Sequence, residues 1–79
     1  MYIATLNPKK VGNTLREVRE EKGFSQGDVV KKTGICITHI SKIERGERKP
    51  TLETLYRICK GMDINVSDMM KEIERELDL

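Results

Sequence analysis

The side chains best suited to polar recognition lie in the middle of this 79-residue sequence. Thr38, His39 and Lys42 are short or polar, and their spacing places them on the outward side of one predicted helix. Hydrogen-bond donors precede and follow that helix at Gln26, Arg45, Arg48 and Lys49. Such a set suits a polyanion that also offers hydrogen-bonding groups, because cationic donors bind anionic oxygens strongly.

The reactive residues are too few for catalysis or for a metal site. His39 is the single histidine, and the two cysteines, Cys36 and Cys59, belong to no C-x-x-C pair. A structural zinc ion takes four ligands, and a nucleophile needs an adjacent base. We therefore expect reduced thiols, no metal, no cofactor, no small-molecule ligand and no enzymatic activity.

Charge is unevenly distributed along the chain, although the net charge is only +2. Residues 9–49 hold eleven lysines and arginines against six acids, whereas residues 50–79 hold four against seven. This division predicts one face that meets a polyanion and another that does not. The opening MYIATLNP has no basic start and no long apolar run, so we expect no signal peptide, no membrane span and a cytoplasmic location.

Hydrophobic periodicity and capping residues predict an all-α, compact five-helix bundle. The expected helices span residues 8–22, 26–33, 37–45, 51–62 and 66–77. Asn7, Ser25 and Asn65 stand where N-caps belong, and a glycine follows each of the first three helices. Residues 1–8 would form an N-terminal tail, and residues 9–79 a single domain.

The last two predicted helices carry apolar stripes. In residues 51–62 the expected stripe comprises Leu52, Leu55, Tyr56, Cys59 and Met62. The stripe of residues 66–77 can belong to the core or to a partner surface, and its first turn can close the domain. We expect a dimer interface at Met69, Met70, Ile73 and Leu77. Four short helices leave the end of this stripe uncovered, so a second copy would bury it and the protein would be a homodimer.

The second and third predicted helices are short, and about three residues around Gly34 separate them, so they must cross steeply. This is helix-turn-helix geometry, in which the second helix protrudes into the major groove of DNA, about 12 Å wide. There Lys42 could donate to guanine, and Thr38 could hydrogen-bond to a base or touch a thymine methyl group. The flanking donors would hold phosphates on either side.

The sequence resembles the Xre/Cro-type, phage-repressor-like helix-turn-helix family over about residues 11–70, in the segments LREVREEKGFSQ, HISKIERGERKPTLETL and MDINVSDMM. The resemblance implies a sequence-specific regulator of transcription that binds double-stranded DNA as a dimer on a palindromic operator. The chain length and C-terminal helix also look like the controller proteins of restriction-modification systems. The alternative is a protein-interaction module, such as an antitoxin or anti-repressor partner, that binds another protein through residues 66–77.

The resemblance also implies roles for single residues. The positions that reach base edges are matched by Ile37, Thr38 and Lys42, with His39 beside them. The positions that hold phosphates are matched by Gln26, Arg45, Arg48 and Lys49, and an ion pair by Arg19 and Glu44. Three residues depart from the family pattern: Cys36 replaces a Ser or Thr cap, Val30 replaces an alanine, and Gly27 weakens its helix. These departures leave the crossing angle of the two helices open.

Overall fold

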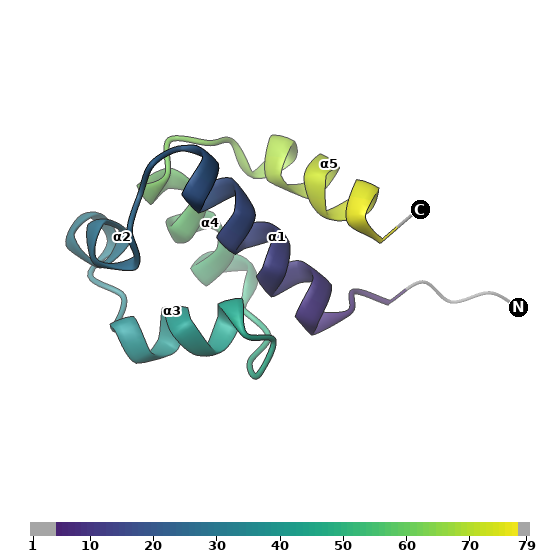
Figure 1. Cartoon of the computed structure of the whole chain (residues 1–79), viewed down its shortest axis with the longest axis horizontal. Coiled ribbons are helices and arrows are strands. Elements are labelled where there is room, and N and C mark those ends of the chain that lie inside the picture. The colour runs from purple at the N-terminus through teal and green to yellow at the C-terminus, as the bar shows by residue number, and fades with distance from the viewer. Residues whose placement is uncertain (1–4, 78–79) are drawn as a thin grey trace, which may run out of the picture.

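The computed structural model describes residues 5–77, and all regular structure in that range is helical. Five helices follow one another, namely α1 (Pro8–Glu21), α2 (Gln26–Thr33), α3 (Ile37–Glu44), α4 (Leu52–Gly61) and α5 (Val66–Glu76) (Figure 1). The all-α, five-helix fold is confirmed, and every predicted boundary is correct within one residue. Of the predicted N-terminal tail, residues 1–4 lie outside the described residues.

Local hydrogen bonds explain where α1 and α2 begin. The Asn7 side chain accepts from the backbone amides of Lys9 and Lys10 at 2.9 and 3.3 Å. Ser25 and Asp28 form a reciprocal capping box, with bonds of 3.0 and 2.8 Å. These bonds satisfy amides that have no partner inside the helix, so the starts of both helices are encoded locally.

Helix α5 begins where the prediction placed it, with Asn65 as the N-cap residue. The Asn65 side chain, however, makes no capping hydrogen bond. The helix begins there because the Asn65 carbonyl accepts from the amide of Met69 at 3.0 Å. Gly34 likewise ends α2 as predicted, with a φ of +73° that side-chain-bearing residues rarely adopt.

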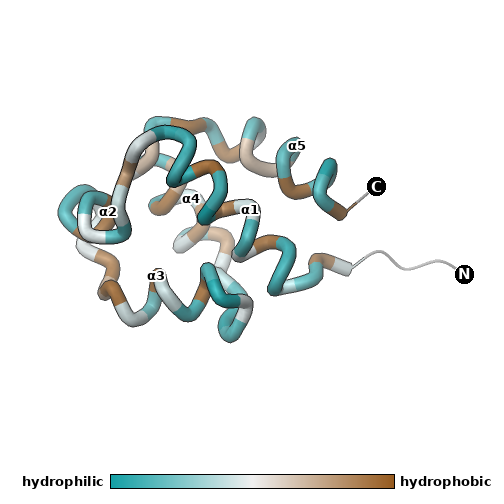
Figure 2. Tube along the Cα trace, viewed as in Figure 1, coloured by the Kyte–Doolittle hydropathy of each residue, from teal (hydrophilic) through white to brown (hydrophobic). Residues whose placement is uncertain are grey.

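The core lies where α1 packs between α3 and α5, and where α4 packs between α2 and α5. Figure 2 shows apolar segments alternating with polar ones along each helix, as expected when one side of each helix faces inward. The largest fully buried side chains come from all five helices: Leu15, Val29, Ile40, Ile43, Cys59, Met62, Met69 and Ile73. Within α3, only Ile40 and Ile43 are buried, whereas Ile37 and Thr38 are exposed.

The predicted stripe of α4 is partly wrong. Leu52 is 79% exposed and Tyr56 is 51% exposed, whereas Ile58, which the prediction omitted, is buried. At about 100° per residue, Tyr56 lies about a quarter turn from the face of Leu55, Ile58 and Cys59, whereas Leu52 lies within about 20° of Cys59 but at the very start of α4. Helices α2 and α5 cover that face and leave Leu52 and Tyr56 outside.

A glycine allows α1 to approach α3 closely. A Cβ atom on Gly12 would overlap the carbonyl oxygen of Ile43 and lie 2.7 Å from that of Glu44. At the next turn, Gly46 has a φ of +77°, and its backbone packs against Lys9. The N-terminal half of α1 is therefore fixed beside the C-terminal end of α3.

Candidate nucleic-acid interface

Helix α3 presents its polar residues to solvent. Ile40 and Ile43 are buried beneath it, Ile37 and Thr38 are exposed, and His39 and Lys42 are half-buried. Thr38 and Lys42 are four residues apart and lie opposite the core, with Ile37 and His39 to either side. The structure therefore brings the four residues expected to contact bases onto one accessible side of α3.

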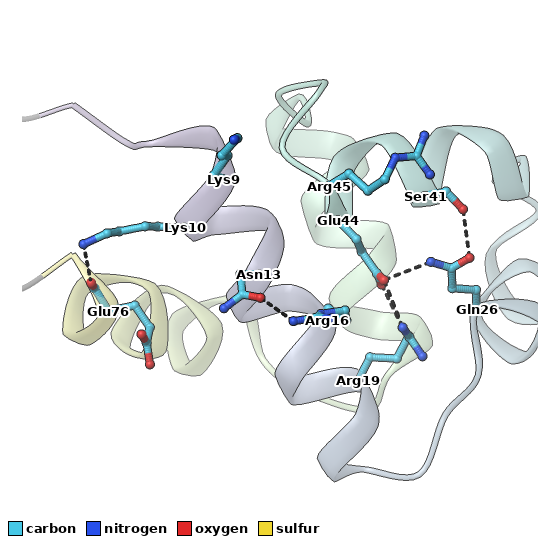
Figure 3. Close-up of a pocket in the computed structure, with 10 residues that line it drawn as sticks. All are labelled: Lys9, Lys10, Asn13, Arg16, Arg19, Gln26, Ser41, Glu44, Arg45 and Glu76. Atoms are coloured by element: carbon cyan, nitrogen blue, oxygen red, sulfur yellow. Dashed lines mark hydrogen bonds and ion pairs between the residues drawn. The ribbon is translucent and has the colours of Figure 1, made fainter.

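A buried ion pair joins α3 to α1. Arg19 donates from Nε and Nη2 to the two carboxylate oxygens of Glu44, at 2.7 and 2.9 Å, and from Nη1 to the carbonyl of Phe24 at 2.8 Å (Figure 3). Both side chains are less than a tenth exposed. The hydrogen bonds to Glu44 raise the pKa of Arg19 above its ordinary value, although burial opposes this shift. Arg19 and Glu44 thus make the ion pair that the resemblance implies.

Gln26 extends this pair to α2. Its Nε2 donates to Glu44 at 2.9 Å, and its Oε1 accepts from the Ser41 hydroxyl at 2.8 Å (Figure 3). A primary amide has two N–H groups, so one remains for a phosphate. We call Arg19, Gln26, Ser41 and Glu44 the polar frame, because they tie three helices together behind the outer face of α3.

The cations expected to hold phosphates follow α3 in an exposed loop. Arg45, Arg48 and Lys49 are all exposed. Arg45 donates to the Glu47 carboxylate at 2.7 Å, which raises the pKa of Arg45 and lowers that of Glu47. Water screens this exposed pair, so a phosphate can replace the carboxylate.

Cys36 occupies the N-cap position of α3. Its thiol makes no capping hydrogen bond, which agrees with the weak cap expected from a sulfur atom. The nearby backbone amides of Thr38 and then His39 nevertheless lower the pKa of this exposed thiol. The first turn of α3 is closed by the Cys36 carbonyl, which accepts from the amides of His39 and Ile40 at 3.0 and 3.1 Å.

The residues expected at a dimer interface do not share one free surface. Met69 is 0% and Ile73 is 1% exposed, so their assignment to the interface is wrong. Helix α1 packs against α5, and Ile73, which the prediction had left uncovered, is buried in the core. Met70 and Leu77 are half-buried at the edge of the core.

An apolar groove of about 380 Å³ opens beside Met70. Its walls come from the segment before α1, the loop after α3, and helices α4 and α5, and they include Leu6, Pro50 and Leu55. Leu52 is the most exposed large apolar side chain of the described residues. The sequence analysis predicted neither the groove nor the exposure of Leu52. The helical spacing of apolar residues in α4 fits a buried and an exposed Leu52 equally well.

A cleft of about 850 Å³ lies between α1 and α3, and sequence reasoning also missed it. Lys9, Lys10, Asn13 and Arg16 of α1 face Ser41 of α3 and Arg45, which follows α3, across it. A glycine inside a predicted helix can indicate close approach to another backbone. Gly12 was therefore the residue from which the close packing of α1 on α3 could have been inferred.

Residues 5–77 contain neither a cluster of metal ligands nor a membrane-spanning helix. In that range, no three His, Cys, Asp or Glu residues lie close enough together to hold a metal ion. No helix there is both long and apolar enough to cross a membrane.

Known proteins share the helix-turn-helix arrangement of α2 and α3. The Helix-turn-helix family model HTH_3 matches residues 15–69, which include α2 and α3. The "Uncharacterized HTH-type transcriptional regulator y4dJ" of Sinorhizobium fredii is 35% identical over 57 residues, covering 72% of this chain and 74% of that protein.

Two relatives are restriction-modification or control proteins. The "Control protein C.MunI" of Mycoplasma sp is 34% identical over 68 residues, covering 85% of this chain and 92% of that protein. A crystal structure shows the restriction-modification controller protein C.Esp1396I as a tetramer in complex with its natural 35 base-pair operator, and the sequence of that protein is 29% identical to this chain. It superposes with a TM-score of 0.86 and covers 96% of this chain and 100% of that one.

Proposed function

The chain belongs to the Helix-turn-helix family, and on that premise we propose that it is a sequence-specific transcriptional regulator that binds double-stranded DNA. The observation that carries the proposal is the accessible outer face of α3, which holds Thr38 and Lys42 above a buried polar frame. The operator complex of C.Esp1396I, whose whole length this chain matches, supports the same function.

In the proposed complex, α3 enters the major groove. Lys42 donates to a base edge, Thr38 and His39 lie against neighbouring bases, and Ile37 makes an apolar contact such as that with a thymine methyl group. Gln26 on one side, and Arg45, Arg48 and Lys49 on the other, hold the two phosphate backbones. Base contacts would give sequence preference, and phosphate contacts would give most of the affinity.

The proposed regulator acts as a homodimer. A second copy would cover the apolar groove and Leu52, whose exposed fraction of 79% leaves much apolar area in water. The tetrameric assembly of C.Esp1396I on its operator supports self-association. Two-fold symmetry then predicts a palindromic operator with half-sites about 34 to 36 Å apart.

Two substitutions test the assignment of DNA contacts on a duplex selected from random sequences. Lys42→Ala should cost about 1 to 3 kcal/mol of binding free energy on the selected duplex and little on random DNA. Arg48→Ala should weaken both duplexes alike and reduce the salt slope by about 0.9, as expected for one lost phosphate contact. Fluorescence anisotropy titrations at several salt concentrations measure both quantities.

The outcomes separate the candidate functions. Equal effects of the two substitutions on both duplexes would show that α3 does not read bases. Wild-type protein without salt-dependent binding to any duplex would refute DNA binding and favour the protein-interaction alternative, in which α5 binds another protein. We prefer the regulator because the relatives y4dJ and C.MunI are a transcriptional regulator and a control protein, although an antitoxin, HipB of Escherichia coli, is also a relative. Catalysis is not part of the proposal, which includes a cytoplasmic location because a regulator must share a compartment with its DNA.

The dimer needs a substitution that spares the core. Leu52→Asp places a charge on the exposed face of α4 and should convert the dimer to a folded monomer, as measured by sedimentation at micromolar concentration. Glu53→Gln, on an exposed neighbour, is the control. A wild-type monomer under these conditions would contradict the proposal.

A further inference from the structure

We propose that the cleft between α1 and α3 is an additional phosphate-binding wall, in which Lys9 and Arg16 hold the DNA strand that passes Gln26. This inference rests on the proposed function and extends the DNA contact to a helix outside the helix-turn-helix pair.

The cleft has an excess of positive charge. Five of its lining residues are cationic, namely Lys9, Lys10, Arg16, Arg19 and Arg45, and two are acidic, namely Glu44 and Glu76. Glu44 is already occupied by three hydrogen bonds from Arg19 and Gln26. Glu76 belongs to α5, on the opposite side of Lys10 from α3 (Figure 3). The part of the cleft beside α3 therefore attracts anions.

Arg16 and Lys9 are the cations of α1 available to a ligand. Arg16 is exposed, and its Nη2 donates to the Asn13 side chain at 2.6 Å, which holds the guanidinium along the outer surface of α1 (Figure 3). Lys9 is also exposed, and its backbone packs against the turn at Gly46. Lys10 instead donates to the carbonyl of Glu76 at 3.4 Å, and so lies toward α5.

The position of the cleft favours a DNA strand as the ligand. Its opposite wall includes Gln26 and Ser41, which border the outer face of α3. A strand at the edge of a groove filled by α3 must pass this wall. Lys9 and Arg16 are seven residues apart, or about 10 Å along α1. Because one strand carries a charge about every 3.4 Å of helix axis, the two cations would meet different phosphates.

The test compares variants that remove these charges. Arg16→Gln and Lys9→Gln should each reduce the slope of log affinity against log salt by about 0.9, and the double variant by about 1.8. The ratio of affinities for selected and random duplexes should not change, because phosphates carry no sequence information. Lys71→Gln, an exposed cation of α5 outside the cleft, is the matched control and should leave the slope unchanged.

Hydroxyl-radical footprinting gives an independent readout. The double variant should lose protection at sugars on one flank of each half-site while keeping protection at the centre. Circular dichroism melts verify that every variant is folded. Wild-type slopes and footprints in the double variant, or equal losses in Lys71→Gln, would overturn the phosphate wall while leaving the proposed function intact. Absence of duplex binding by wild-type protein would instead overturn the proposed function.

Discussion

Replacing Arg19 with methionine should destabilise the protein by about 3 to 5 kcal/mol, because it leaves the buried Glu44 charge without its partner. The Arg19 and Glu44 side chains are only 9% and 7% exposed, so water cannot compensate for the loss. The carbonyl of Phe24 loses its donor as well. At roughly 4 to 8 °C per kcal/mol for a domain of this size, the midpoint of thermal unfolding should fall by about 12 to 40 °C.

Urea denaturation followed by circular dichroism measures this free energy directly. Arg75→Met is the matched control, because Arg75 and Glu72 form an exposed pair at 3.0 Å whose side chains are 72% and 37% exposed. Its effect should stay below about 1 kcal/mol. The double variant Arg19→Met with Glu44→Leu should be more stable than Arg19→Met alone, because it removes the unpaired charge.

Two results would refute this reasoning. One is an Arg19→Met variant within 1 kcal/mol of the wild type, on the scale set by exposed pairs. The other is a double variant whose destabilisation equals the sum of the two single changes, since residues in contact must show coupling.

Three more predictions follow from burial and close packing. Gly12→Ala should lower the free energy of unfolding by about 1 to 3 kcal/mol, because its Cβ would overlap the carbonyl of Ile43. Gly27→Ala, whose Cβ would meet only one atom at 3.6 Å, should raise it by about 0.5 to 1 kcal/mol. Urea denaturation measures both changes, and changes of the same sign would contradict the close approach. Native protein should react with one equivalent of a thiol reagent, because the exposed Cys36 has a lowered pKa and burial raises the pKa of Cys59 to about 11; two fast equivalents would contradict the burial. The folded protein also holds the Cys59 proton more tightly than the unfolded chain does. Part of the free energy of unfolding should therefore be lost as the pH rises from about 9 to 11. A Cys59→Ala variant whose stability falls equally over this pH range would argue against this linkage.

The helices were predictable because their signals are local. The capping box of Ser25 and Asp28 and the positive φ of Gly34 involve residues within one turn of each other. The outer face of α3 was also accessible to sequence reasoning, because Ile40 and Ile43 fix which side of an eight-residue helix is buried.

Features that depend on distant packing were not predictable from periodicity. Leu52 fits an apolar stripe, but its exposure is decided by where α2 and α5 lie. Ile73 is buried in the core, where α5 packs against α1, and no local signal specifies that contact. Arg19 and Glu44 are 25 residues apart, so their pairing followed from family resemblance alone. The resemblance implies that Gln26 braces the recognition helix, whereas its particular hydrogen bonds to Ser41 and Glu44 came from the structure.

The polar frame has a consequence for how this protein can acquire new targets. Its hydrogen bonds use Arg19, Gln26, Ser41 and Glu44, and none of them uses Thr38, His39 or Lys42. Exchanges on the outer face of α3 should therefore change stability by no more than about 0.5 kcal/mol, as is usual for surface sites. Divergence toward a different operator can proceed one residue at a time, with every intermediate protein still folded.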